Sequence, residues 1–224
     1  MDILPAEPVA TNRKWYELWL EVWKHPSDTS FKSILNERDH EAMRGFIWIG
    51  VSSLIAGIVA QIATFQTTRA LLQYPSGRDI FLYVCGVIIF PIAAIIGMMI
   101  SAGIFHLIAK IFHGNGKWSD LVYCFSAITA PSSIIVAIGT VINFAFVSIQ
   151  ILSLIVSICI IIIYLILAIY SIVLYINAIK SVENIGTGPA VATYFIPTII
   201  LLLIGACIFF TFAIASSTTG GLSQ

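Results

Sequence analysis

The sequence predicts an all-α polytopic integral membrane protein, with five transmembrane helices preceded by short amphipathic interfacial helices. Of its 224 residues, 59% are hydrophobic and only 10% are charged, whereas soluble domains carry about 25% charged residues. The stretch from Leu121 to Ile179 contains no Asp, Glu, Lys or Arg. At roughly 20 residues per crossing, it is long enough for two membrane-spanning helices joined by a tight turn. The formal net charge of zero argues against a nucleic-acid partner.

Charged residues gather at the front of the chain. Of the eleven Lys and Arg residues, six precede Gly45, as do eight of the eleven Asp and Glu residues. The sequence therefore divides into three parts: a cytoplasmic N-terminal segment with interfacial helices (1–42), a five-helix transmembrane domain (43–215) and a short polar tail (216–224).

The N-terminal segment contains three tryptophans at helical spacing. Trp15, Trp19 and Trp23 recur with Leu18 and Val22 at i, i+3, i+4, i+7 and i+8, which places all five on one helical face. An indole ring suits the headgroup boundary, because most of it is apolar and its N–H can still donate a hydrogen bond. We expect an interfacial helix with these tryptophans in the lipid bilayer. The alternative is a helix packed on a partner domain or under the transmembrane bundle.

Five apolar runs give the predicted membrane spans. They cover approximately residues 43–65, 80–108, 121–142, 152–178 and 194–215. Pro91, Pro131 and Pro197 lie inside or near the entry of a span and are predicted helix bends. A proline would break a helix in water, but neighbouring helices and Ser or Thr side chains accommodate it in a membrane.

The second span carries a stripe of small residues. Ala93, Gly97 and Ser101 repeat every four residues, so they form one smooth face along which another helix could approach closely. This face is predicted to pack within the bundle or across a homo-oligomer.

The sequence shows none of the usual signatures of catalysis, cofactor binding or metal binding. It has no HExxH, GxSxG or phosphate-binding glycine loop, and the four cysteines sit singly in apolar runs. His106 lies near a span end, where we expect it at the membrane interface, without an intramembrane carboxylate to pair with. We therefore predict no catalytic residue, no cofactor and no metal site. The polar amides Asn143, Gln150 and Asn177 are read either as interhelical or membrane-edge groups, or as the lining of a small-molecule path.

The distribution of basic residues predicts the orientation. With five spans, nine Lys and Arg residues fall on the side of the N-terminus, and only Arg69 and Arg78 fall on the other. Basic loops stay in the cytoplasm. We therefore expect a multi-pass protein of the cell membrane, with a cytoplasmic N-terminus and the C-terminus outside.

Three motifs in this layout resemble the Yip1 family, in particular its prokaryotic members. The first is the N-terminal pattern Trp19-x-x-x-Trp23-x-x-Pro26-x-x-x-x-Phe31-x-x-Ile34-Leu35. The second is Gly116-Lys117-Trp118-x-x-x-x-Tyr123 followed by Pro131, and the third is the link from Ile179 to Ala190 before the last span. The resemblance covers the chain from about Trp15 to Phe212.

The resemblance implies a five-span membrane protein, placed in the Golgi or ER membrane if the source is eukaryotic. Eukaryotic members act in the early secretory pathway, where they bind one another and prenylated Rab-type GTPases. They carry a longer N-terminal region with an Asp-Leu-Tyr-Gly-Pro-like motif. This chain has neither feature, which argues against GTPase binding.

Two functions follow for this chain. The first is a non-enzymatic scaffold or adaptor that organises or curves the membrane by association with itself or with other membrane proteins. The alternative is a small permease or an accessory subunit of a transporter.

Overall fold

The computed structural model describes residues 13–37, 41–72, 77–146 and 149–219, and every element in them is an α-helix. Two short helices come first, α1 (Trp15–Lys24) and α2 (Asp28–Leu35). Five long helices follow: α3 (Ala42–Leu72), α4 (Gly77–Ile111), α5 (Trp118–Ala145), α6 (Gln150–Glu183) and α7 (Thr187–Thr219). Each of the five is long and apolar enough to cross a membrane. The predicted all-α membrane architecture with five spans is confirmed.

The long helices extend past the predicted spans at both ends. One such extension is at the end of α6, which continues through Lys180 and Glu183, residues expected in the link before the last span. Hydropathy marks only the part of a helix that contacts lipid, whereas the helix itself ends where its backbone is capped. Here the cap is Asn184, whose left-handed conformation (φ 53°) ends the helix.

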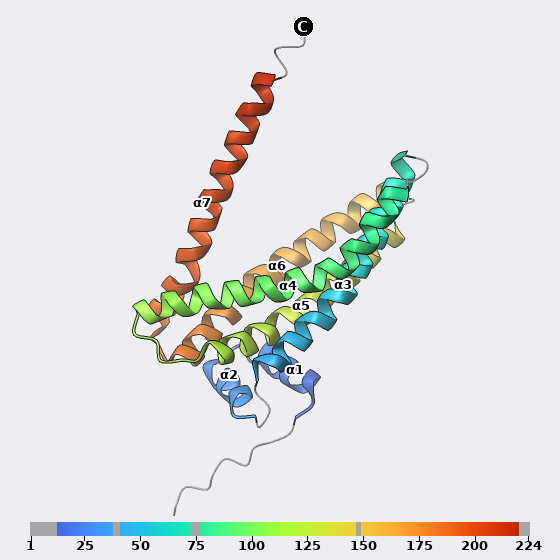
Figure 1. Cartoon of the computed structure of the whole chain (residues 1–224). Coiled ribbons are helices and arrows are strands. Elements are labelled where there is room, and N and C mark those ends of the chain that lie inside the picture. The colour runs from blue at the N-terminus through green and yellow to red at the C-terminus, as the bar shows by residue number, and fades with distance from the viewer. Residues whose placement is uncertain (1–12, 38–40, 73–76, 147–148, 220–224) are drawn as a thin grey trace, which may run out of the picture.

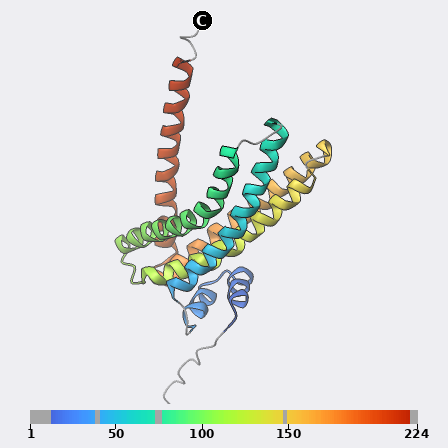
Figure 2. The ribbon, with the colours of Figure 1, turned by 45° about the vertical axis from the view of Figure 1, so that its right-hand side comes forward.

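The long helices form an uneven bundle, which Figures 1 and 2 show from two directions. Helices α3, α5 and α6 run side by side, and α1 and α2 lie together below one end of them. Figure 2 shows that α4 bends sharply along its length; Pro91 lies in its interior. Helix α7 leaves the bundle after its first turns (Figure 1).

Helix α5 forms the centre of the bundle. Its residues from Leu121 to Ile128 are all buried, and α3, α6, α4 and α1 all pack against it. Helix α3 approaches it closely at Gly45, where an added Cβ would lie 2.8 Å from the Ser126 hydroxyl oxygen and 3.3 Å from the Tyr123 Cα. A glycine there allows α3 and α5 to touch at the end that also contacts the N-terminal helices.

Candidate functional site

The two N-terminal helices, together with the chain on either side of them (residues 13–37), form a unit that we call the N-terminal platform. Its inner face is built from the predicted apolar pattern of α1, since Leu18 and Val22 are completely buried. Phe31 and Ile34 of α2 are buried as well. Helix α1 packs against α5, and α2 packs against α6 and α5. The platform is therefore held against the end of the transmembrane bundle.

The three predicted interface tryptophans lie at different depths. Trp19 and Trp23 are partly buried against the core, and their indole N–H groups are covered, with no hydrogen-bond partner among the described residues. Trp15 keeps 50% of its surface exposed. The burial of Trp19 and Trp23 corresponds to the alternative stated from the sequence, a helix packed under the transmembrane bundle. The role at the membrane interface remains a prediction, for which Trp15 has the required exposure.

Aromatic rings join the platform to the bundle. Trp15 meets Trp19 edge to face at 4.6 Å between ring centroids, and Trp19 meets Trp48 of α3 at 5.8 Å. Trp48 in turn lies 5.1 Å from the buried ring of Tyr123. Such edge and tilted contacts each add roughly 0.5–1.5 kcal/mol beyond the area that they bury.

One face of α6 holds the turn between α1 and α2. The Tyr170 hydroxyl donates to the Trp23 carbonyl, and the Asn177 amide donates to the Pro26 carbonyl at 2.9 Å. Residues 170 and 177 are seven apart, so they share one helical face. Asn177 is therefore a hydrogen-bonding group between segments, one of the two readings that its sequence position allowed.

One turn further along α6, an ion pair also attaches the platform to this helix. Lys180 of α6 lies 2.6 Å from Asp28 at the start of α2, with both side chains 30% exposed. The Ser181 hydroxyl donates to the Asp28 carbonyl at 3.3 Å. Because a partly exposed pair contributes at most about 1 kcal/mol, its main effect is to fix the position of the first turn of α2.

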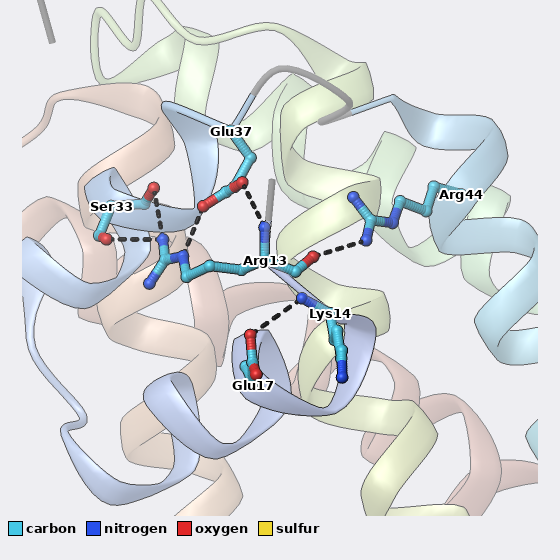
Figure 3. Close-up of polar contacts among 6 residues, drawn as sticks. All are labelled: Arg13, Lys14, Glu17, Ser33, Glu37 and Arg44. Atoms are coloured by element: carbon cyan, nitrogen blue, oxygen red, sulfur yellow. Dashed lines mark hydrogen bonds and ion pairs between the residues drawn. The ribbon is translucent and has the colours of Figure 1, made fainter. Parts of the chain in front are cut away.

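A second polar cluster joins the two ends of the platform, Arg13 and Glu37, to each other (Figure 3). The Arg13 guanidinium bonds the buried Glu37 carboxylate at 2.5 Å and donates to the Ser33 hydroxyl at 2.8 Å and to the Ser33 carbonyl at 3.1 Å. Arg44 of α3 donates to the Arg13 carbonyl at 3.3 Å. Arginine suits this position because its planar group presents several donors in a fixed arrangement. The cluster joins the chain before α1, the end of α2 and the start of α3.

The most buried charged group in the described structure is Glu183, the last residue of α6, with no exposed surface. Its carboxylate lies 2.6 Å from His106 Nδ1 of α4 and accepts the Gly116 N–H at 3.0 Å. Its carbonyl accepts the Asn115 N–H at 3.0 Å. This corrects the expectation that His106 has no carboxylate to pair with. The sequence predicts Glu183 in the link before the last span, whereas the structure continues α6 as far as Glu183 and so brings it beside α4.

Glu183 organises the connection between α4 and α5. Both carboxylate oxygens have partners, and no three His, Cys, Asp or Glu side chains converge on a metal position within the described ranges. A buried carboxylate with such partners is costly to disturb and stabilises one arrangement of the chain. We call Glu183, His106 and the connection 112–117 the Glu183 junction.

Two of the three residues in the predicted packing stripe on α4 are exposed in the described structure. Ala93 and Gly97 are exposed, and an added Cβ at Gly97 would meet no described atom within 4 Å. Ser101 is partly buried and its hydroxyl donates to the Met98 carbonyl of its own helix. Helix packing along this stripe stays a prediction. Because Ala93 and Gly97 are exposed, the partner helix would belong to another molecule.

The three predicted bend prolines all lie inside continuous helices, Pro91 in α4, Pro131 in α5 and Pro197 in α7. Of these helices, α4 shows a sharp bend in Figure 2. The residues that hold the platform and the Glu183 junction in place, which include Arg13, Glu37 and Glu183, are not among the predicted site residues. A signal was present for the platform, since polar Tyr170, Asn177 and Ser181 recur at helical spacing in an otherwise apolar run.

The comparisons with known proteins agree with this architecture. A family model described as the Yip1 domain matches residues 20–209, from within α1 to within α7. No curated protein and no solved structure matches the chain. The matched range includes most of the platform, the Glu183 junction and all five spans, and it covers well over half of the sequence. The chain therefore belongs to the Yip1 family.

Proposed function

We propose that this multi-pass membrane protein is a non-enzymatic scaffold of the Yip1 type, and that the N-terminal platform is its contact surface for other membrane proteins. The observation that carries the proposal is the attachment of the platform to α6 through Tyr170, Asn177 and Lys180. A segment fixed in this way presents a surface of constant shape, which lowers the ordering cost of binding a partner.

The outer face of the platform is suited to such contacts. Charged side chains are exposed along it, at Lys14, Glu17, Lys24 and Lys32. Tyr16 and Leu20 lie among these charged residues and are 40% and 49% exposed, respectively. A mixed surface of aromatic, aliphatic and charged groups is typical of protein interfaces.

Releasing the platform tests this role. We expect Asn177→Ala combined with Lys180→Ala to reduce cross-links between the platform and its protein partners at least several-fold, because two of its attachments to α6 are lost. The measurement is cross-linking in native membranes, followed by purification and mass spectrometry. Ser171→Ala is the matched control, since that hydroxyl bonds the Leu167 carbonyl of its own helix. Unchanged cross-links at equal protein levels in the double variant contradict the scaffold role.

We further propose that the platform is cytoplasmic and the C-terminus lies on the opposite side, as the basic residues suggest. In a variant without native cysteines, we expect a membrane-impermeant maleimide added to intact cells to label Arg78→Cys and to spare Lys117→Cys. Both positions are exposed, at opposite ends of the membrane-spanning helices. The reverse labelling pattern would invert the proposed orientation.

Self-association through the open stripe of α4 is part of the proposal. We expect Gly97→Leu to weaken self-association by tenfold or more, because a bulky side chain keeps the backbones of two helices apart. Its stability as a monomer should change little, since the Cβ position at Gly97 is open. Fluorescence energy transfer between labelled copies in vesicles measures the association. Leu107→Phe, at another exposed position of α4, serves as control, and equal energy transfer from Gly97→Leu and the unmodified chain counts against the stripe.

The alternative role, a permease or transporter subunit, has less support. Asn143 lines a groove of about 280 Å³ between the far ends of α3, α5 and α6, where its amide oxygen accepts the Ser157 hydroxyl. Asn177 does not line that groove, because its amide is bound to the platform. The side chain of Gln150 lies outside the described residues. A small molecule that co-purifies in equal amount with the chain would revive this role.

A further inference from the structure

An apolar groove runs along the outside of the bundle where the platform meets α3. Its volume is about 480 Å³, within the roughly 300–1,000 Å³ typical of small-molecule sites. Trp15 and Trp19 of α1 form one wall. The other wall and the floor come mainly from Ile47, Trp48, Val51 and Ile55 of α3.

The groove and Arg44 together extend over about one leaflet of a bilayer. The α3 residues that line the groove run from Ile47 to Ile55, a rise of roughly 12 Å at 1.5 Å per residue. With Arg44, one turn before Trp48, the rise is roughly 16 Å. This is about half of the ~30 Å hydrocarbon core. The part of the wall farther from Arg44 is open to the membrane, since Val51 and Ile55 are 55% and 44% exposed. An acyl chain is the partner that suits such a surface.

The end of the groove next to the platform carries a positive charge. The Arg44 guanidinium lies 5.4 Å above the ring of Trp48, a groove wall. It is half-buried, and the hydrogen bond to the Arg13 carbonyl occupies one of its five N–H donors. Figure 3 shows that this bond holds the group beside the start of α1. Lys14, which follows Arg13 in the chain, is exposed and adds a second positive charge near this end of the groove. A phosphate oxygen beside Arg44 could accept hydrogen bonds from the other N–H groups of its guanidinium, whose planar shape suits phosphate.

We propose that this groove is a binding site for one anionic phospholipid of the surrounding bilayer, with an acyl chain between α1 and α3 and the phosphate on Arg44. The indoles of Trp15 and Trp19 lie beside the glycerol region, at the depth that tryptophan prefers in membranes. The site needs only the described geometry and a membrane around it. It depends neither on the scaffold role nor on which side the N-terminus faces.

Lipids with brominated acyl chains test the proposal, since bromine quenches tryptophan fluorescence on contact. Trp23→Phe and Trp118→Phe in the full chain leave Trp15, Trp19 and Trp48, all of which line the groove. The purified protein is placed in phosphatidylcholine vesicles that contain a minor fraction of either brominated phosphatidylglycerol or brominated phosphatidylcholine. We expect phosphatidylglycerol to compete for the groove about fivefold more effectively, the factor that one basic side chain provides beside anionic lipid.

Variants of the two ends of the groove separate the contributions. Arg44→Gln should abolish the preference for phosphatidylglycerol while keeping a donor for the Arg13 carbonyl, and Arg44→Lys should retain part of it. Arg78→Gln, an exposed arginine at the other end of the bundle, should leave the preference unchanged. Val51→Phe should narrow the groove and reduce quenching by brominated phosphatidylglycerol with Arg44 intact, a result that holds even if Arg44→Gln does not fold.

Two results would overturn the assignment. One is equal quenching by the two brominated lipids in the starting protein, which means that the groove holds only bulk lipid. The other is a preference for phosphatidylglycerol that survives Arg44→Gln. Neither result bears on cross-linking to protein partners, so failure of the lipid site and failure of the scaffold role are distinguishable.

Discussion

Replacing Glu183 by alanine is expected to lower the free energy of unfolding by about 3–5 kcal/mol, the range for removing one member of a buried pair. The substitution leaves His106 and the Gly116 N–H, both partly buried, without their described acceptor, and removes a carboxylate that is itself fully buried. Reversible unfolding in mixed detergent micelles, followed by tryptophan fluorescence, measures the loss.

Two further variants show whether the loss comes from the junction. Glu183→Gln should lose less than Glu183→Ala, because an amide can still accept the Gly116 N–H and donate to a neutral imidazole. Glu41→Ala removes a carboxylate at an exposed position and should change the free energy of unfolding by less than about 0.5 kcal/mol. If Glu183→Ala and Glu41→Ala unfold alike, Glu183 does not hold the junction together.

The second large effect is expected at Gly116, in the same junction. An added Cβ would lie 2.5 Å from the Val182 carbonyl oxygen and 2.9 Å from its carbonyl carbon, and both are backbone atoms of α6. The connection must therefore move away from α6, which separates the Gly116 N–H from Glu183. We expect Gly116→Ala to lower the free energy of unfolding by about 2–4 kcal/mol, from overpacking and a lost hydrogen bond to a buried charge.

Another glycine of the chain supplies the matched comparison. Gly188 lies in the first turn of α7, and an added Cβ there would meet no described atom within 4 Å. Gly188→Ala should be neutral or raise the free energy of unfolding by up to about 1 kcal/mol, since alanine favours the helix. The prediction fails if the two alanine variants unfold at the same detergent fraction.

The five spans could be predicted from the sequence because lipid imposes a simple rule on the chain. Every backbone polar group inside the membrane must be bonded within its own helix, so long apolar runs have one available structure. The Leu121–Ile179 stretch gave two helices with a turn at the expected place, where α5 ends at Ala145 and α6 begins at Gln150. The inner face of α1 was likewise legible from its period, since Leu18 and Val22 are buried.

The polar contacts were not predictable in the same way. Glu183 and His106 are 77 positions apart, and Asn177 and Pro26 are 151 apart. No local pattern connects residues at such separations, because their distance depends on how the spans pack. An apolar count also placed Lys180 and Glu183 in a loop, although charged residues commonly occupy the last turn of a membrane helix. Small residues alone do not show which helix face packs within the chain. An added Cβ at Gly45 would contact α5, whereas one at Gly97 would have no described atom within 4 Å.

The attachment of the platform to α6 sets an order of assembly during synthesis. Helices α1 and α2 leave the ribosome before the five long helices, and Asn177 and Ser181 are made about 150 residues later. At a synthesis rate of roughly 5–20 residues per second, these contacts therefore form on the order of ten seconds after α1 and α2 are made. Leu18 and Val22 wait for a different helix, since α1 packs against α5, which begins at Trp118. The platform is thus made before the five long helices, and its attachment is completed only once α6 has been made.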